Sequence, residues 1–163
     1  MDLQLRDHVV IITGGTSGIG AATALALASE GACPVLIGLD PMPDNLATAL
    51  TATGVRYGHH AVDLRDHTAV AAFVAEVIAT FGRIDGLVNN DGINDRVDLM
   101  AGPAAFTASL ERNLIHYYTM AHLTLSSLIQ STGAIVNVAS KTALTGQGDT
   151  SGYCASKGGQ LAL

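Results

Sequence analysis

The chain has 163 residues, of which 48% are hydrophobic and 13% charged, so it is not a disordered chain and can bury one sizeable core. Its formal net charge of −6, with no basic block, argues against a nucleic-acid partner. The chain shows no signal-peptide pattern and no apolar run of membrane-spanning length, so we expect a cytoplasmic protein with no membrane partner.

The first half of the chain alternates strand patterns with helix patterns. Short apolar, β-branched runs indicate strands, whereas alanine-rich or amphipathic stretches that stop at a glycine indicate helices. The predicted elements are, in order, a strand at 9–13, a helix at 21–30, a strand at 34–39, a helix at 44–53, a weaker strand at 55–62 and a helix at 66–81.

The second half continues this alternation. A strand is predicted at 84–89, a loop at 91–102 and, opened by Pro103, a long helix to about residue 130. Another strand follows at 134–139, and a last helix begins at Ser151 or Gly152.

Such alternation predicts an α/β fold, a Rossmann-type doubly wound parallel sheet with helices on both faces, as a single domain over residues 1–163. The sequence stops at Leu163, within a helix pattern, and no strand follows to cover the edge formed by the fifth. We therefore expect a sheet that is incomplete at its C-terminal edge.

Three glycines, Gly14, Gly18 and Gly20, fill the turn between the first strand and the first helix. Glycine permits positive φ and close backbone approach, so a pyrophosphate can reach the N-terminus of the helix. The spacing is GxxxGxG rather than the commoner GxGxxG, and a turn needed only for packing is the alternative. Their position favours dinucleotide binding.

Acidic and amide residues follow the next three strands. Asp40 lies where a carboxylate can bond a ribose 2′-hydroxyl and reject a 2′-phosphate, although it also fits an ordinary loop before Pro41. Asp63 ends the third strand, and its alternative role is a helix N-cap that Asp66 can also fill. Asn90, after the fourth strand, either lines a cleft or belongs to a simple turn.

A candidate proton-transfer site lies near the end of the chain. Tyr153 and Lys157 are one helical turn apart, so on a helix they share a face. A tyrosine hydroxyl normally titrates near ~10, and an adjacent ammonium lowers that pKa. Ser140 follows a buried strand and points its hydroxyl toward the same place. Tyrosine and lysine at this spacing also meet by chance, so the pair alone is weak evidence.

Other polar residues give weaker signals. Asn113 interrupts the long predicted helix, where a buried asparagine often bends or opens the helix and a solvated one is the usual explanation. The histidines offer no set of metal ligands, so we expect no metal site. Cys33 and Cys154 suggest neither a disulfide framework nor a metal pair.

Together, these motifs resemble the short-chain dehydrogenase/reductase family from Val9 onward. TGGTSGIG at 13–20 resembles its cofactor loop, Asp63-Leu64 its adenine contact and NNDG at 89–92 its NNAG motif. The resemblance implies a catalytic tetrad of Asn113, Ser140, Tyr153 and Lys157. It implies that the cofactor is bound by Gly14, Thr16, Ser17, Gly18, Ile19, Gly20, Asp40, Asp63, Leu64, Asn90, Tyr153 and Lys157.

The resemblance also implies a role for each member of the tetrad. Tyr153, as a phenolate, removes the proton of a substrate hydroxyl while a hydride passes to the nicotinamide. Lys157 lowers the pKa of that tyrosine and binds the nicotinamide ribose, and Ser140 polarises the substrate oxygen. Asn113 positions a water molecule that links Lys157 to bulk solvent.

Two segments, 109–122 and 140–163, are similar to a narrower group within that family, the bacterial L-fucose dehydrogenases. This similarity implies an NAD(P)-dependent oxidoreductase that acts on a secondary alcohol or a sugar lactol such as an L-fucose-like aldose. A reductase for a steroid or 3-oxoacyl substrate is one alternative, and a non-catalytic dinucleotide-binding fragment is another.

The sequence departs from the family pattern at three points. Asp91 replaces the alanine of NNAG, and its carboxylate either weakens cofactor binding or faces solvent. Asp40 lies slightly late for the acidic residue of NAD enzymes, but no arginine is present for NADP, so we expect NAD without excluding NADP. The family's domain continues past residue 163 with further strands, a substrate loop and part of a tetramer interface, so we expect a C-terminally truncated chain whose full-length form is a homo-oligomer.

Overall fold

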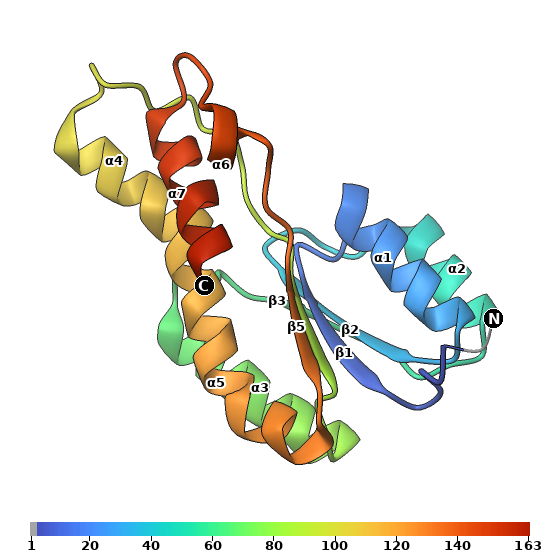
Figure 1. The fold of residues 1–163 in the computed structure, drawn as a ribbon. Helices are drawn as coiled ribbons and strands as arrows, with labels where there is room; N and C mark the ends of the chain where they lie inside the picture. Colours follow the sequence, from blue (N-terminus) through green and yellow to red (C-terminus); the bar gives the residue numbers. More distant parts are fainter. Residues whose placement is uncertain (1–2) are drawn as a thin grey trace.

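Five parallel strands form the centre of the computed structural model, which describes residues 3–163 (Figure 1). The strand order is β3-β2-β1-β4-β5, and every neighbouring pair is parallel. The Rossmann-type α/β architecture expected from the sequence is confirmed. The strands are β1 (Val9–Thr13), β2 (Cys33–Gly38), β3 (Gly58–Ala61), β4 (Gly86–Asn89) and β5 (Ala134–Asn137).

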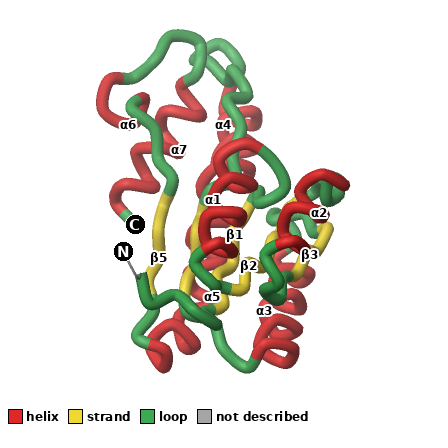
Figure 2. The backbone as a smooth tube through the Cα atoms, turned by 90° about the vertical axis from the view of Figure 1, so that its right-hand side faces the viewer, coloured by secondary structure: helices red, strands yellow, loops and turns green. Residues whose placement is uncertain are grey.

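Helices cover both faces of the sheet, and in Figure 2, which looks onto one of these faces, they lie in front of and behind the strands. The helices are α1 (Gly18–Ser29), α2 (Asp44–Ala52), α3 (His67–Phe81), α4 (Gly102–Leu110), a π-helical segment η1 (Glu111–Ile115), α5 (His116–Ser131), α6 (Thr142–Thr145) and α7 (Ser151–Ala162). None of the helices within residues 3–163 has the length and apolar content that a membrane span needs.

Two apolar clusters fill the spaces between the sheet and its helices. Because β1 and β2 are buried on both faces, their successive side chains enter the two clusters alternately. One cluster joins the sheet to α1 and α2 through Ile12, Leu36, Ala24 and Leu46. The other joins the sheet to α3 and α5 and contains Ile11, Ile37, Phe73, Val77, Leu87 and Met120.

Most strand and helix boundaries differ from the sequence-based expectation by a few residues, and three differences are larger. The third strand pairs only over Gly58–Ala61, and Val55 and Tyr57 before it pack against the cluster beside α1 and α2. The long helix expected at 103–130 is divided by η1. A short helix, α6, occupies part of the segment between β5 and α7, where no element was expected.

The strand order places a topological switch between β1 and β4. The chain moves from β1 outward through β2 and β3, then returns to the other side of β1 with β4 and β5. Ligands of such sheets bind at the carboxyl ends of the strands beside this switch. Within the described residues β5 pairs only with β4, and Ile135 and Val136 are 40% and 52% exposed, so the prediction of a buried strand before Ser140 is wrong.

Asp85 ties together the opposite ends of three strands. Its Oδ2 accepts a hydrogen bond of 2.8 Å from the Val9 amide, and Arg83 forms an ion pair with its Oδ1 at 2.6 Å. Its own carbonyl accepts from Ala134 N at 3.1 Å. Burial acts to raise the pKa of Asp85, but the hydrogen bonds from Arg83 and Val9 prevail and hold it below its usual 3.8.

We expect Asp85→Asn to lower the free energy of unfolding by about 2 kcal/mol at pH 7, because a buried, charge-assisted contact is lost. A carboxylate with a depressed pKa stabilises the fold above its unfolded pKa and loses that contribution as the pH falls through the folded pKa. The difference between variant and wild type in urea unfolding should therefore shrink below about pH 4. The exposed Asp149→Asn is the matched control, and an equal loss in both variants would contradict the role of Asp85.

Candidate functional site

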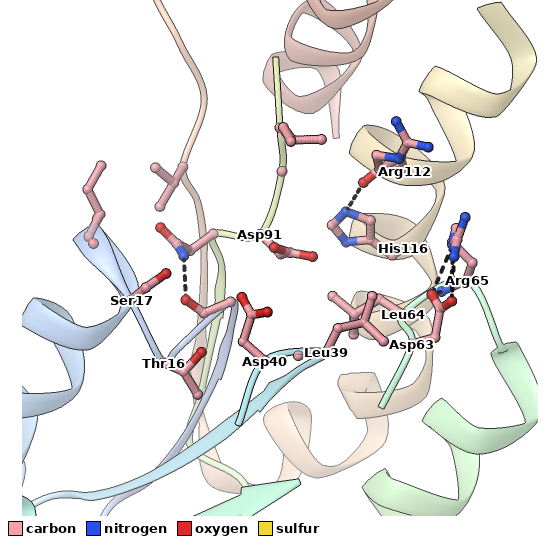
Figure 3. Close-up of a pocket in the computed structure, with 18 of the residues that line it drawn as sticks. Thr16, Ser17, Leu39, Asp40, Asp63, Leu64, Arg65, Asp91, Arg112 and His116 are labelled. Carbon is pink, nitrogen blue, oxygen red and sulfur yellow. Dashed lines mark hydrogen bonds and ion pairs between the residues drawn. The ribbon is translucent and has the colours of Figure 1, made fainter. Parts of the chain in front are cut away.

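A cavity of about 570 Å³ opens at the carboxyl ends of the strands (Figure 3). Every strand contributes to its wall through the segment that follows it, and α5 and α7 close one side. Eleven of the residues expected to bind cofactor line it, namely Gly14, Thr16, Ser17, Gly18, Ile19, Asp40, Asp63, Leu64, Asn90, Tyr153 and Lys157.

The glycine loop between β1 and α1 has the geometry that close approach of a ligand requires. Gly14 and Gly18 have φ of +61° and +51°, a region that favours glycine, and a Cβ at Gly18 would meet only open space. Gly20 does not line the cavity, but a Cβ there would overlap the Gly14 carbonyl oxygen. Ser17 caps α1 without a side-chain hydrogen bond, so the N-terminal amides of this 12-residue helix have no side-chain cap. This loop fits the pyrophosphate of a dinucleotide.

Asn90 fastens β4 to the glycine loop. Its Nδ2 donates to the carbonyl oxygens of Thr13 at 2.9 Å and Gly14 at 3.3 Å. Thr13 Oγ1 accepts from the backbone amides of Asn90 and Asp91 at 2.9 and 3.0 Å. The asparagine amide therefore satisfies the neighbouring strand end and holds one wall of the cavity.

The acidic residues after β2 and β3 lie on the same side of the cavity. Asp63 forms an ion pair of 2.6 Å with Arg65, and hydrogen bonds from that side chain and backbone lower the pKa of Asp63 to about 2. The N-cap of α3 is Asp66, whose carboxylate accepts from the amides of Thr68 and Ala69, so Asp63 is not needed as a cap. Asp40 is exposed and lines the cavity.

The helix α7 brings Tyr153 and Lys157 to the opposite wall. The Lys157 Nζ lies 5.5 Å from the centroid of the Tyr153 ring and donates to Val138 O at 2.8 Å. Only 3% of Lys157 is exposed, and this burial lowers its pKa to about 8 against the opposing effect of Asp91. The pair on one helical face expected from the sequence is thus present, with its charged member buried.

Ser140 and Asn113 do not line the cavity. The Ser140 Oγ accepts hydrogen bonds from Thr142 N at 3.3 Å and Thr142 Oγ1 at 3.1 Å, at the start of α6. Asn113 is fully buried in η1, where its Oδ1 accepts from Ile93 N at 2.7 Å and its Nδ2 donates to Ser109 O at 3.1 Å. The side chain of Asn113 therefore holds the loop after β4, and its burial excludes the alternative of a solvated asparagine.

Asp91 faces the cavity rather than solvent. Its Oδ1 lies 2.9 Å from the position that a Cβ on Gly14 would occupy, and Figure 3 shows its side chain above the glycine loop. Burial raises the pKa of Asp91, as do the negative charges of Asp40 and Asp63, while Lys157 and the Gly92 amide act against this shift. A carboxylate at this point therefore places negative charge beside the loop that fits a pyrophosphate.

Sequence reasoning missed three residues of the site. His116 and Arg112 line the cavity from one side, and burial lowers the pKa of His116 to about 4, so its imidazole is neutral. Gln160 contacts both Lys157 and Asn113. The sequence signal that could have found them was helical spacing: His116 lies three residues after Asn113, and Gln160 lies three residues after Lys157, so each shares a helical face with a predicted site residue. Among residues 3–163, no group of three or more His, Cys, Asp or Glu side chains is placed to hold a metal ion.

Comparison with known proteins identifies close relatives. A family model described as short chain dehydrogenase matches residues 8–163. The levodione reductase of Leifsonia aquatica is 36% identical over 166 residues, which cover 98% of this chain and 62% of the reductase. The L-fucose dehydrogenase of Mus musculus is 34% identical over 158 residues, which cover 95% of this chain and 56% of that enzyme. The chain thus spans less than two thirds of the length of either relative.

Solved structures show the same fold. An NAD+-bound xylitol dehydrogenase superposes with a TM-score of 0.90 at 28% identity, covering 98% of this chain and 63% of that one. A metagenomic short-chain oxidoreductase in complex with NADP also superposes with a TM-score of 0.90, at 34% identity, covering 97% of this chain and 73% of that one.

The carboxylate of Asp91 gives a prediction for ligand binding. We expect Asp91→Asn to bind NADH about ten-fold more tightly than wild type at pH 8, because one negative charge beside the pyrophosphate is removed. Wild-type affinity should increase as the pH is lowered toward the raised pKa of Asp91, whereas the affinity of the variant should not. NADH fluorescence titration from pH 6 to 9 measures both.

The exposed Asp44→Asn is the control for net charge. If both variants bind NADH as wild type does at every pH, Asp91 has no influence on the ligand.

Proposed function

The chain belongs to the short-chain dehydrogenase family, and on that basis we propose that it transfers hydride between a nicotinamide dinucleotide, preferably NAD, and a secondary alcohol or sugar lactol. Its relatives include dehydrogenases and reductases, which is consistent with this reaction class.

One observation carries the proposal. A single cavity joins the glycine loop at the N-terminus of α1 to the Tyr153–Lys157 pair on α7. The first is suited to a pyrophosphate and the second to proton transfer, so a ligand that spans the cavity meets both.

In the proposed mechanism, the glycine loop and the α1 N-terminus bind the pyrophosphate, while Asp63 and Leu64 contact the adenine. When bound, the nicotinamide supplies the hydride acceptor or donor. Tyr153 removes the proton of the substrate hydroxyl in the oxidative direction and returns it in the reductive direction. The positive charge of Lys157 lies 5.5 Å from the centroid of the Tyr153 ring. Ser140, whose Oγ accepts from Thr142 Oγ1, keeps its own O–H to donate to the substrate oxygen.

The preference for NAD rests on Asp40. Its carboxylate follows β2 and lines the cavity, where it can accept from a ribose 2′-hydroxyl but repels a 2′-phosphate. No cation stands beside it in the sequence, which reads Gly38, Leu39, Asp40 and Pro41. For the substrate, 34% identity to an L-fucose dehydrogenase supports an L-fucose-like aldose.

A second candidate function is dinucleotide binding without turnover. Two observations favour it, because the Ser140 hydroxyl is engaged by Thr142 outside the cavity and Asp91 places a carboxylate inside it. Binding and turnover measurements on the same variants separate the two functions.

We expect Tyr153→Phe to reduce the turnover of L-fucose with NAD by about 1,000-fold, because the base is removed while the ring remains. Its Kd for NADH, measured by fluorescence titration, should stay within about two-fold of wild type, since the phenol ring still fills the wall of the cavity. The exposed Tyr118→Phe is the matched control and should retain full activity. Comparable turnover in the Tyr153 and Tyr118 variants would show that Tyr153 is not the base. If the wild-type protein binds NADH but does not oxidise L-fucose, the second candidate function is supported.

Asp40→Ser tests the choice of cofactor. Wild type should bind NADH at least about ten-fold more tightly than NADPH, and the variant should lose most of that difference because the repelling charge is gone. Parallel titrations with the two nucleotides give the ratio, with the exposed Asp44→Ser as control. A wild type that binds both equally would show that Asp40 does not discriminate.

A further inference from the structure

The ammonium of Lys157 is held by three acceptors inside the protein. Its Nζ donates to Val138 O at 2.8 Å, to Gln160 Oε1 at 3.0 Å and to Tyr117 Oη at 3.4 Å. An ammonium has three N–H donors, so these contacts use all of them. The acceptors come from the end of β5, from α7 and from α5, and their arrangement fixes the position of the charge.

Gln160 is unlike the other two acceptors because it connects Lys157 to a second catalytic candidate. Only 2% of Gln160 is exposed, and both ends of its amide have partners. The Oε1 accepts from Lys157, while the Nε2 donates to the main-chain carbonyl of Asn113 at 2.5 Å. A buried amide with both ends bonded is rigid, and it transmits the position of one partner to the other.

The local helix geometry makes this contact possible. Asn113 lies in η1, and π turns shift the backbone hydrogen bonds of a helix and recur at functional sites. Its carbonyl accepts from a side chain on a different helix. On α7, Gly159 lies so close to Leu114 that a Cβ would come within 2.8 Å of its Cδ2, which lets the neighbouring Gln160 reach η1.

We propose that Gln160 is a positioning residue that holds the Lys157 ammonium and links it, through its own amide, to the main chain of Asn113. Its catalytic meaning rests on the proposed function, because it acts through Lys157.

The surroundings of Lys157 give the expected direction of change. The ionisable groups that face it are Asp91 after β4, His116 and Tyr117 on α5 and Tyr153 on α7. Burial disfavours the ammonium, and each acceptor partly offsets that effect. Removal of the Gln160 carbonyl should therefore make the ammonium easier to deprotonate, while a carboxylate at the same position should make it harder.

The chain offers a direct measurement because it contains only two lysines, Lys141 and Lys157. In protein labelled with 13C at lysine Cε, NMR should give one signal for each, and Lys141→Arg assigns them. We expect the Lys157 signal to titrate near pH 8 in wild type. The midpoint should fall by about one to two pH units in Gln160→Leu and rise by about one unit or more in Gln160→Glu.

If the Lys157 midpoint falls in Gln160→Leu and rises in Gln160→Glu, Gln160 positions the ammonium. A general loss of structure would not shift the midpoint in opposite directions in the neutral and the charged variant. Gln130→Leu, exposed on α5, is the matched control and should leave the midpoint unchanged. If Gln160→Leu does not fold, Gln160→Glu alone still tests the contact. A Lys157 midpoint that stays at the wild-type value in the Gln160 variants that fold would overturn the proposal.

The titration needs neither cofactor nor turnover, so its failure is distinct from failure of the proposed function. In active enzyme, the alkaline limb of the pH profile of kcat should move with the Lys157 midpoint in each Gln160 variant. Shifted midpoints with an unmoved kcat profile would overturn the catalytic part of the proposal. If the Lys157 midpoints shift as expected but the protein binds no NADH, the contact between Gln160 and Lys157 is established and the proposed dehydrogenase function is rejected.

Discussion

The burial of one positive charge constrains the organisation of this fold around its cavity. Lys157 is almost wholly removed from solvent, and a buried ammonium without acceptors is too costly to keep. The acceptors are Val138, which directly follows β5, Gln160 on α7 and Tyr117 on α5, a helix far from α7 in the sequence. The placement of α7 against α5 and β5 is therefore coupled to the protonation of a single side chain.

The parallel sheet supplies the frame in which these helices meet. Its carboxyl ends lie at one edge, and hydrogen bonds between strand ends keep that edge in register. Asn90 and Thr13 join β4 to the glycine loop at the cavity, and Asp85 joins β1, β4 and β5 at the opposite ends. With both ends fixed in this way, the glycine loop and α7 face each other across a cavity of defined size.

The electrostatics of the cavity are divided between its walls. Asp40 and the Asp63–Arg65 pair follow β2 and β3, whereas Lys157 lies on α7 and the neutral His116 on α5. Asp91 stands between them, and its pKa reflects burial together with the charges on both sides. Under the proposed function, a dinucleotide in this cavity would meet both the Lys157 cation and these carboxylates, which would link its binding electrostatically to proton transfer.

The sequence by itself determined the fold class and the order of the elements, because these depend on local patterns, and its resemblance to a known family pointed to most of the lining of the cavity. Apolar runs, glycine spacing and the helical interval from Tyr153 to Lys157 are all properties of neighbouring residues. The pairing limits of β3 were not predictable from the sequence. Asn113 signalled a possible interruption of the long helix, but the sequence did not decide between a buried and a solvated asparagine. Only the tertiary structure decided that Asp91 faces the cavity and that Gln160 joins Lys157 to Asn113. Those outcomes depend on which distant groups surround a side chain, and neither periodicity nor spacing encodes that information.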